Sequence, residues 1–203
     1  MAPASPVLPP DITLYFVRHG ETDWNATRRY QGQADIPLND VGRAQARRNG
    51  EALRGLLPAI AAADFVASPL GRTQDTMRIL RDALDLAPDG FRTDPRLAEL
   101  HYGHWQGQLQ RDLPRLDPAG VAGRQADPFH WRPEGGENYA DLTRRLTGWL
   151  ETVTRDSVVV SHGGVSRALR CMLVEGVCEA DVPSLEVPQD RVLVIRGGTM
   201  DWL

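Results

Sequence analysis

The most constraining feature of the chain is a short run of valines, SVVVSH at residues 157–162, which is apolar at every position from 158 to 160. A strand without alternation of apolar and polar residues is buried on both faces, as in a parallel sheet that helices cover from either side. Two further runs, ITLYFV at 12–17 and DFVAS at 64–68, also have the composition of strands. Parallel strands need long crossover connections, so these runs predict an α/β protein.

Stretches with apolar residues at helical spacing separate the predicted strands. They predict helices at 40–57, 71–84 and 137–153, and a fourth helix at 165–176. We therefore expect an α/β fold, a three-layer α/β/α sandwich around a mostly parallel central sheet. The chain ends in RVLVIR and TMDWL, which Gly197 and Gly198 join as a two-residue hairpin turn. This hairpin predicts an antiparallel edge at the C-terminal end of the sheet.

The length of 203 residues suits a single domain, 1–203, with one core. Residues 1–10, MAPASPVLPP, are rich in proline and are expected to form a flexible N-terminus. Residues 103–136 are rich in Gly, Pro, Asp and Arg and predict no strand or long helix, only a short helix near LQRDLPRL at 109–116. An irregular segment of this length in a compact domain is usually functional or disordered. We expect it to form a small cap insertion over one end of the sheet.

Charge and targeting signals limit the classes of partner. A net charge of -4 gives no general field that would attract nucleic acid or an anionic membrane. The first residues lack the charged and apolar regions of a signal peptide, and no apolar stretch reaches the length of a membrane span. Cys171 and Cys178 are predicted to be unpaired, small core residues in a reducing compartment. We expect a soluble cytoplasmic protein. An exposed strand edge near TMDWL would permit two copies to pair as a homodimer.

Basic side chains follow each of the predicted parallel strands. Arg18 and His19 end the first strand, Arg72 begins the helix after the second, and His162 precedes Gly163 at the end of the third. Ligand sites of such sheets lie at the carboxyl ends of the strands, so we expect these residues around one crevice. Arginine forks bind phosphate oxygens, and a neutral imidazole is a competent nucleophile. The two histidines could alternatively bind a metal, but neighbouring Asp and Glu residues complete no ligand spacing such as HExxH.

Four sequence blocks make this interpretation specific. RHGET after a strand, SPLGRTQDT, LAELHYGHWQG, and SHGG after a strand occur in this order and together resemble the histidine phosphatase superfamily, also called the phosphoglycerate mutase-like family. The resemblance spans residues 12–170. It implies that His19 is the phospho-accepting nucleophile, and that Arg18, Arg72 and His162 complete the phosphate pocket. It also implies that Glu99 is the proton donor to the leaving oxygen.

The resemblance extends to residues that would contact the substrate. Asn25, Gln31 and Gly32 fall where family members touch the phosphate or its ester. PEGGEN resembles the family's Gly-Gly-Glu-Ser stretch, so Glu137 either belongs to the site or only favours the start of the following helix. His101, Tyr102, His104 and Trp105 either contact the alcohol portion of the substrate or pack within the cap. The expected substrate-binding residues are Arg18, Asn25, Gln31, Gly32, Arg72, Glu99, Tyr102, His162 and Gly163.

The expected function is hydrolysis of a small phosphorylated metabolite through a phosphohistidine, with release of inorganic phosphate and without a metal or other cofactor. In this mechanism His19 is neutral, a backbone carbonyl fixes its second ring nitrogen, and a protonated His162 helps to hold the phosphate. A phosphoglycerate mutase and a non-catalytic phospholigand-binding module are the alternatives. The family's mutases resemble one another in a cap lysine followed by an adjacent arginine pair. The cap arginines of this chain, Arg111, Arg115, Arg124 and Arg132, stand apart, which favours water as the acceptor.

Overall fold

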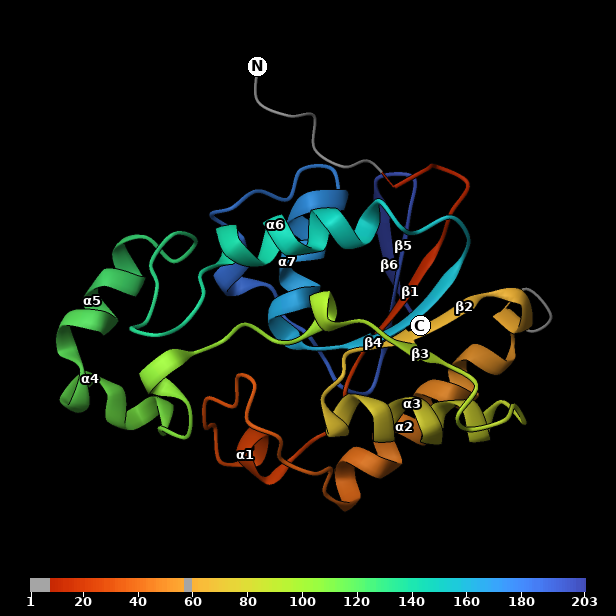
Figure 1. Cartoon of the computed structure of the whole chain (residues 1–203), viewed down its shortest axis with the longest axis horizontal. Coiled ribbons are helices and arrows are strands. Elements are labelled where there is room, and N and C mark those ends of the chain that lie inside the picture. Colours follow the sequence, from red (N-terminus) through yellow and green to blue (C-terminus); the bar gives the residue numbers. More distant parts are fainter. Residues whose placement is uncertain (1–7, 57–59) are drawn as a thin grey trace.

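The computed structural model describes residues 8–56 and 60–203, whose strands form one six-stranded sheet (Figure 1). The strand order is β3-β2-β4-β1-β5-β6. The parallel strands are β1 (Leu14–Arg18), β2 (Asp64–Ala67), β3 (Arg92–Thr93) and β4 (Ser157–Ser161), and the antiparallel edge consists of β5 (Val192–Arg196) and β6 (Thr199–Trp202). The predicted mostly parallel sheet with an antiparallel C-terminal edge is confirmed.

The valine-rich strand β4 lies between β1 and β2, and all five of its residues are buried. The predicted central strand is therefore confirmed. The turn between β5 and β6 has positive φ at both Gly197 (+53°) and Gly198 (+78°), as a two-residue hairpin of this kind requires. The two-residue edge strand β3 was not predicted, because so short a segment carries no periodic pattern.

Helices cover both faces of the sheet (Figure 1). The helices α2 (Asp40–Arg54) and α3 (Gly71–Ala83) lie on one face, and α6 (Tyr139–Leu150) and α7 (Gly163–Leu173) lie on the other. Alternate side chains of β1 pack in the two cores on opposite faces of the sheet. Leu14 and Phe16 pack in the core beneath α6 and α7, whereas Tyr15 and Val17 pack in the core beneath α2 and α3. The three-layer sandwich is thus confirmed.

The predicted helices differ from the observed ones mainly at their ends. The helix expected at 40–57 ends at Arg54, and its last predicted residue lies outside the described residues. The helix expected at 137–153 begins at Tyr139, because Asn138 forms a capping box with Asp141. The last helix begins at Gly163, two residues earlier than predicted, and ends at Leu173.

Residues 103–136 contain more regular structure than the sequence predicts. The short helix expected near 109–116 is confirmed as the 3₁₀ turn η4 (Gln110–Asp112) and the helix α4 (Leu113–Leu116). The nine-residue helix α5 (Pro118–Ala126) was not predicted. Both helices stand to one side of the sandwich, at the left of Figure 1. The remaining short elements are α1 (Asp23–Ala26), η1 (Ile60–Ala62), η2 (Pro95–Leu97), η3 (Gly103–Trp105) and η5 (Val182–Ser184).

The two cysteines are free thiols in different environments. Cys171 is half-buried in α7, but Cys178 is exposed. The prediction of two core cysteines is therefore wrong for Cys178, because the chain leaves the helix after Leu173. In the described parts of the chain, no helix has the length and apolar character needed to cross a membrane. Most of the predicted flexible N-terminus, residues 1–7, lies outside the described residues.

Candidate active site

His19 is held by its backbone and by its ring. Its main-chain N–H donates to the carbonyl of Ser161 at 2.9 Å, and its carbonyl accepts from the side chain of Gln189 at 2.9 Å. The ring is 2% exposed, with Nδ1 2.8 Å from the carbonyl of Gly20 and Nε2 3.3 Å from Nε of Arg72. A guanidinium can only donate, so Nε2 carries the lone pair and Nδ1–H donates to the carbonyl. The expected carbonyl contact is therefore present.

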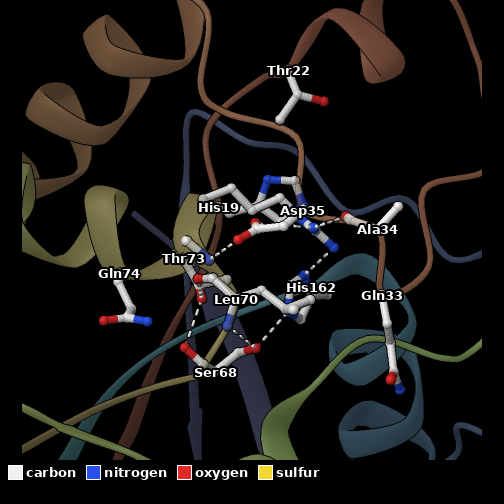
Figure 2. A network of polar contacts seen from close by, with 12 residues as sticks. His19, Thr22, Gln33, Ala34, Asp35, Ser68, Leu70, Thr73, Gln74 and His162 are labelled. Atoms are coloured by element: carbon white, nitrogen blue, oxygen red, sulfur yellow. Dashed lines mark hydrogen bonds and ion pairs between the residues drawn. The ribbon is translucent and has the colours of Figure 1, made fainter.

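Arg72, at the start of α3, contacts both histidines. Figure 2 shows His162 beside Ser68. The guanidinium of Arg72 donates to the carbonyls of Gly32 and Ala34, each at 2.7 Å, and lies 3.3 Å from Nδ1 of His162. By the same donor rule, Nδ1 of His162 accepts, so its Nε2–H donates to the hydroxyl of Ser68 at 2.8 Å. One arginine thus fixes the tautomers of both rings, whose centroids are 5.2 Å apart.

Burial and neighbouring cations keep both histidines neutral. Burial, followed by the charges of Arg72 and Arg18, holds the pKa of His19 well below its ordinary value. Burial and Arg72 have the same effect on the pKa of His162. His162 is thus neutral in the free site, and its expected protonation during the reaction stays a prediction. Burial also lowers the pKa of Arg72 to about 10, which leaves this side chain cationic at neutral pH.

Arg18 lies against the first turn of α7. Its NH1 donates to the carbonyl of Val187 at 2.8 Å, whereas its Nε is buried without a hydrogen-bond partner. A Cβ on Gly163 would stand 3.6 Å from that Nε. The structure thus brings Arg18, His19, Arg72, His162 and Gly163 together at the carboxyl ends of β1, β2 and β4.

Glu99 faces the start of the same helix and is 8% exposed. One of its oxygens accepts from the N–H of Leu100 at 2.8 Å, and both accept from the N–H of Gly164 at 3.1 and 3.2 Å. A Cβ on Gly164 would stand only 2.4 Å from Oε1, so the carboxylate fits because this residue is glycine. The carbonyl of Glu99 accepts from Gln33 at 3.0 Å and from Arg145 at 3.1 Å, which fixes the main chain.

Glu137 has a role that neither sequence interpretation included. It lies outside α6, where Asn138 occupies the N-cap position. Its Oε2 accepts from the N–H of His101 at 2.9 Å, and its Oε1 pairs with Nε of Arg145 at 3.2 Å. Glu137 and Arg145 together brace the segment that carries Glu99.

The remaining predicted substrate contacts, Asn25, Gln31 and Gly32, have different surroundings in the structure. Gly32 has a φ of +54° and holds Arg72 through its carbonyl, and Gln31 is buried with no partner for Oε1. Asn25 caps α1 with Thr22, and its Oδ1 lies 3.3 Å from Nε2 of Gln189, the side chain that also holds His19.

Tyr30 and Trp105 form part of the wall of a cavity of about 460 Å³ that α4 and α5 also line. Tyr102 packs against Tyr30 with tilted rings whose centroids are 4.7 Å apart, and Trp105, 1% exposed, packs on Trp131 at 4.6 Å. Arg124 lies over the rings of Tyr30, Tyr102 and Trp105. Trp105 therefore packs within the segment.

The other candidate residues of this segment already have polar partners in the structure. His104 lies 3.0 Å from Asp117, and His101 accepts from the N–H of Gly103 at 3.0 Å. Arg132 pairs with Asp141 at 2.6 Å and Arg111 with Asp112 at 3.9 Å. Among the described residues, no cluster of three or more His, Cys, Asp or Glu side chains could hold a metal ion.

Sequence reasoning assigned no role to two residues that orient the histidines. Ser68 directly follows β2 and contacts His162, so its strand-end position was a usable signal. Gln189 lies 170 residues from His19 in a loop, where no sequence pattern indicates the contact.

Comparison with known proteins gives consistent matches over nearly the whole chain. The family model described as the histidine phosphatase superfamily (branch 1) matches residues 14–202. A glucosyl-3-phosphoglycerate phosphatase of Mycolicibacterium vanbaalenii is 35% identical over 94% of this chain and 82% of its own length. A probable phosphoglycerate mutase GpmB of Yersinia pestis is 35% identical over 80% and 73%. The solved structure of mycobacterial glucosyl-3-phosphoglycerate phosphatase Rv2419c with VO3 superposes with a TM-score of 0.77 at 32% identity, covering 95% of this chain and 96% of that one.

Proposed function

The chain belongs to the histidine phosphatase superfamily (branch 1), and we propose that it hydrolyses a small phosphorylated metabolite through a phosphohistidine on His19. The observation that carries the proposal is the unprotonated Nε2 of His19, which faces a buried arginine and a second neutral histidine. Phosphoryl transfer requires an aligned nucleophile and fixed positive charge around the phosphoryl oxygens. The similarity to glucosyl-3-phosphoglycerate phosphatases supports an ester of a small metabolite as substrate.

In the first half of the reaction, Arg18 and Arg72 bind the non-bridging phosphate oxygens and Nε2 of His19 attacks phosphorus. The bond between Arg72 Nε and His19 Nε2 must open first, so that Nε donates to phosphate instead. Nδ1–H of His19 remains on the carbonyl of Gly20 and keeps the ring aligned. A phosphate oxygen beside Nδ1 of His162 needs a donor there, so phosphate binding would draw a proton onto that ring while Ser68 accepts from Nε2.

Glu99 supplies the proton for the departing alcohol. The P–O ester bond breaks as the N–P bond forms, and the alkoxide takes the Glu99 proton. Water then attacks the phosphohistidine, Glu99 takes a proton from that water, and inorganic phosphate leaves with His19 restored. The N–H groups of Leu100 and Gly164 hold the carboxyl group in place through both steps.

We extend the proposal to the cap, to the place of the alcohol, and to the location and pairing of the enzyme. We propose that the chain is a single domain in which 103–136 is the cap, and that the alcohol occupies the cavity lined by Tyr30 and Trp105. We also propose a cytoplasmic enzyme that pairs through its edge strand β6, which has a neighbouring strand on one side only.

Phosphoglycerate mutase is the second candidate, because one relative is named a probable mutase. A mutase must hold a second anionic group in its cap while it excludes water. Arg111 and Arg132 pair with acidic residues, and no adjacent arginine pair exists in 103–136. We therefore expect poor interconversion of phosphoglycerates even with 2,3-bisphosphoglycerate present. Isomerisation of 3-phosphoglycerate faster than phosphate release from the best ester would reverse the assignment.

A panel of phosphomonoesters, with release of inorganic phosphate as the measurement, tests the function itself. At least one ester should turn over, and His19→Ala should abolish that turnover while the protein still folds and binds phosphate. The absence of turnover on every ester would favour a non-catalytic phospholigand-binding module. His19→Ala activity within tenfold of the parent would remove His19 from the role of nucleophile.

A further inference from the structure

The cavity that the cap helices line is built mainly from apolar side chains. Its volume of about 460 Å³ lies within the range of about 300–1,000 Å³ that is usual for small-molecule sites. Its wall contains two aromatic residues, three prolines, a leucine and a valine, and its polar side chains are those of Gln110, Arg124 and Gln125. No carboxylate lines it in the described part of the chain. Burial of polar groups without partners is unfavourable, so this space suits a mostly apolar ligand.

Two segments of the chain connect the cavity wall to the phosphate pocket. Tyr30, in the wall, lies two residues before Gly32, whose carbonyl accepts from Arg72 at 2.7 Å. Pro183, also in the wall, lies four residues before Val187, whose carbonyl accepts from the other pocket arginine at 2.8 Å. Because an extended chain spans at most about 3.6 Å per residue, these distances along the chain are at most about 7 Å and about 14 Å. An alcohol esterified to the bound phosphate can therefore reach the cavity within a few bonds.

Aromatic rings connect the cavity to the segment of the proposed proton donor. Tyr102 lies three residues after Glu99, and its ring packs against Tyr30 with centroids 4.7 Å apart. Tyr30 in turn packs against Trp105, with centroids 5.4 Å apart. Tyr30 and Trp105 line the cavity, so the rings form one continuous cluster from the segment of Glu99 to the wall.

Arg124 supplies the positive charge of the wall, and the same rings engage it. Its Cζ lies 5.3 Å from the ring centroid of Tyr30, 5.8 Å from that of Tyr102 and 5.7 Å from that of Trp105, and it donates to the hydroxyl of Tyr30. A planar guanidinium beside aromatic rings offers a flat surface on which a further ring can stack. Its charge disfavours a cationic alcohol. A polyhydroxy alcohol would bury more hydroxyl groups than the two glutamines of the wall can pair.

We propose that the substrate is a phosphomonoester of an apolar, ring-bearing alcohol, whose ring fills the cavity that Tyr30 and the cap helices α4 and α5 line. This inference rests on the proposed phosphatase function and narrows its substrate class. The substrate is then less polar than the glucosyl-3-phosphoglycerate after which the mycobacterial relatives are named.

Esters of three primary alcohols test the proposal on the unmodified enzyme. Cyclohexylmethyl phosphate and glucose 6-phosphate both carry the phosphate on a CH2 group attached to a six-membered ring, and they differ in the hydroxyl groups and the ring oxygen. Ethyl phosphate lacks the ring. Burial of one methylene group corresponds to about fourfold in binding, so kcat/KM for cyclohexylmethyl phosphate should exceed that for each of the other two esters by more than about tenfold.

Substitutions on α5 then locate this preference. Val121 is half-buried in the wall, and Val121→Asn, which adds an amide there, should lower the preference for cyclohexylmethyl over ethyl phosphate about tenfold. Gln125→Leu makes the wall more apolar and should raise the preference about fourfold. Ala122→Asn is the matched control, because Ala122 lies on the same helix but is exposed and outside the wall. This control should keep the preference of the parent.

Three results would overturn the proposal. They are a kcat/KM for glucose 6-phosphate or ethyl phosphate that equals or exceeds that for cyclohexylmethyl phosphate, a preference that neither Val121→Asn nor Gln125→Leu changes, and loss of the preference in Ala122→Asn. The first needs no variant, and the increase expected in Gln125→Leu cannot arise from misfolding. Hydrolysis of these esters without the preference would sink this inference alone, whereas no hydrolysis of any ester would sink the proposed function.

Discussion

Replacement of Gly164 by alanine should lower kcat/KM without a large loss in the free energy of unfolding. The added Cβ would stand 2.4 Å from Oε1 of Glu99, whereas ordinary contact requires about 3.4 Å, so the carboxyl group must move by about 1 Å. The next heavy atom outside that side chain, Cβ of Leu100, is 3.5 Å away and needs no adjustment. A displacement of about 1 Å at a catalytic group costs on the order of 100-fold, or about 2.7 kcal/mol of transition-state free energy.

The assay compares kcat/KM for an alkyl and an aryl phosphate. Loss of the aligned proton donor should reduce alkyl turnover about 100-fold and aryl turnover much less, because a phenolate leaves with little protonation. Glycine-to-alanine changes in helices stabilise by roughly 0.5–1 kcal/mol, so the free energy of unfolding should not fall by more than about 1 kcal/mol. Gly148→Ala in α6, where the nearest atom would be 4.0 Å away, is the control and should retain activity. Alkyl turnover of Gly164→Ala within threefold of the parent, in a folded protein, would refute the reasoning.

Three further predictions concern the same site. Because the pKa values of buried His19 and His162 lie well below that of an unfolded histidine, the unfolded state binds more protons than the folded state below pH 6.5. Denaturant titrations should therefore show the free energy of unfolding decreasing as the pH is lowered through this range, by up to about 2.7 kcal/mol per pH unit, and an unchanged slope in His162→Asn would contradict this. Glu99→Gln should cost alkyl phosphates about 100-fold or more and aryl phosphates less than about tenfold, and equal losses would instead indicate a positioning role. Activity should survive EDTA, and vanadate should inhibit better than phosphate; a loss that divalent ions restore would defeat the metal-independent mechanism.

Local sequence patterns predicted the parts of the fold that local chemistry controls. The unbroken apolar run of β4 required burial on both faces, and this placed the carboxyl ends of β1 and β2 beside it. The helix α5 was missed because Gly120 and Gly123 lower helix propensity. Tertiary packing explains the glycine at position 123, because a Cβ there would stand 2.6 Å from the ring of Trp131.

The chemistry of the site was less accessible from the sequence. The neutral state of His162 depends first on its burial and then on a guanidinium that the carbonyls of Gly32 and Ala34 hold in place, and no sequence pattern gives that geometry. The contact of Gln189 with His19 likewise joins residues 170 positions apart. The residue types at the strand ends were predictable, whereas their protonation and their supporting contacts needed the folded structure.

The central claim is that His19 carries the phosphoryl group, and rapid-quench labelling tests it most directly. The enzyme is mixed with its best ester, labelled in the phosphoryl group, and quenched in alkali, in which phosphohistidine survives. The account predicts a burst of protein-bound phosphate that mass spectrometry locates on His19, that forms and decays at least as fast as turnover, and that is absent from His19→Ala. Full turnover with no label on His19, or with the label on another residue, would contradict it.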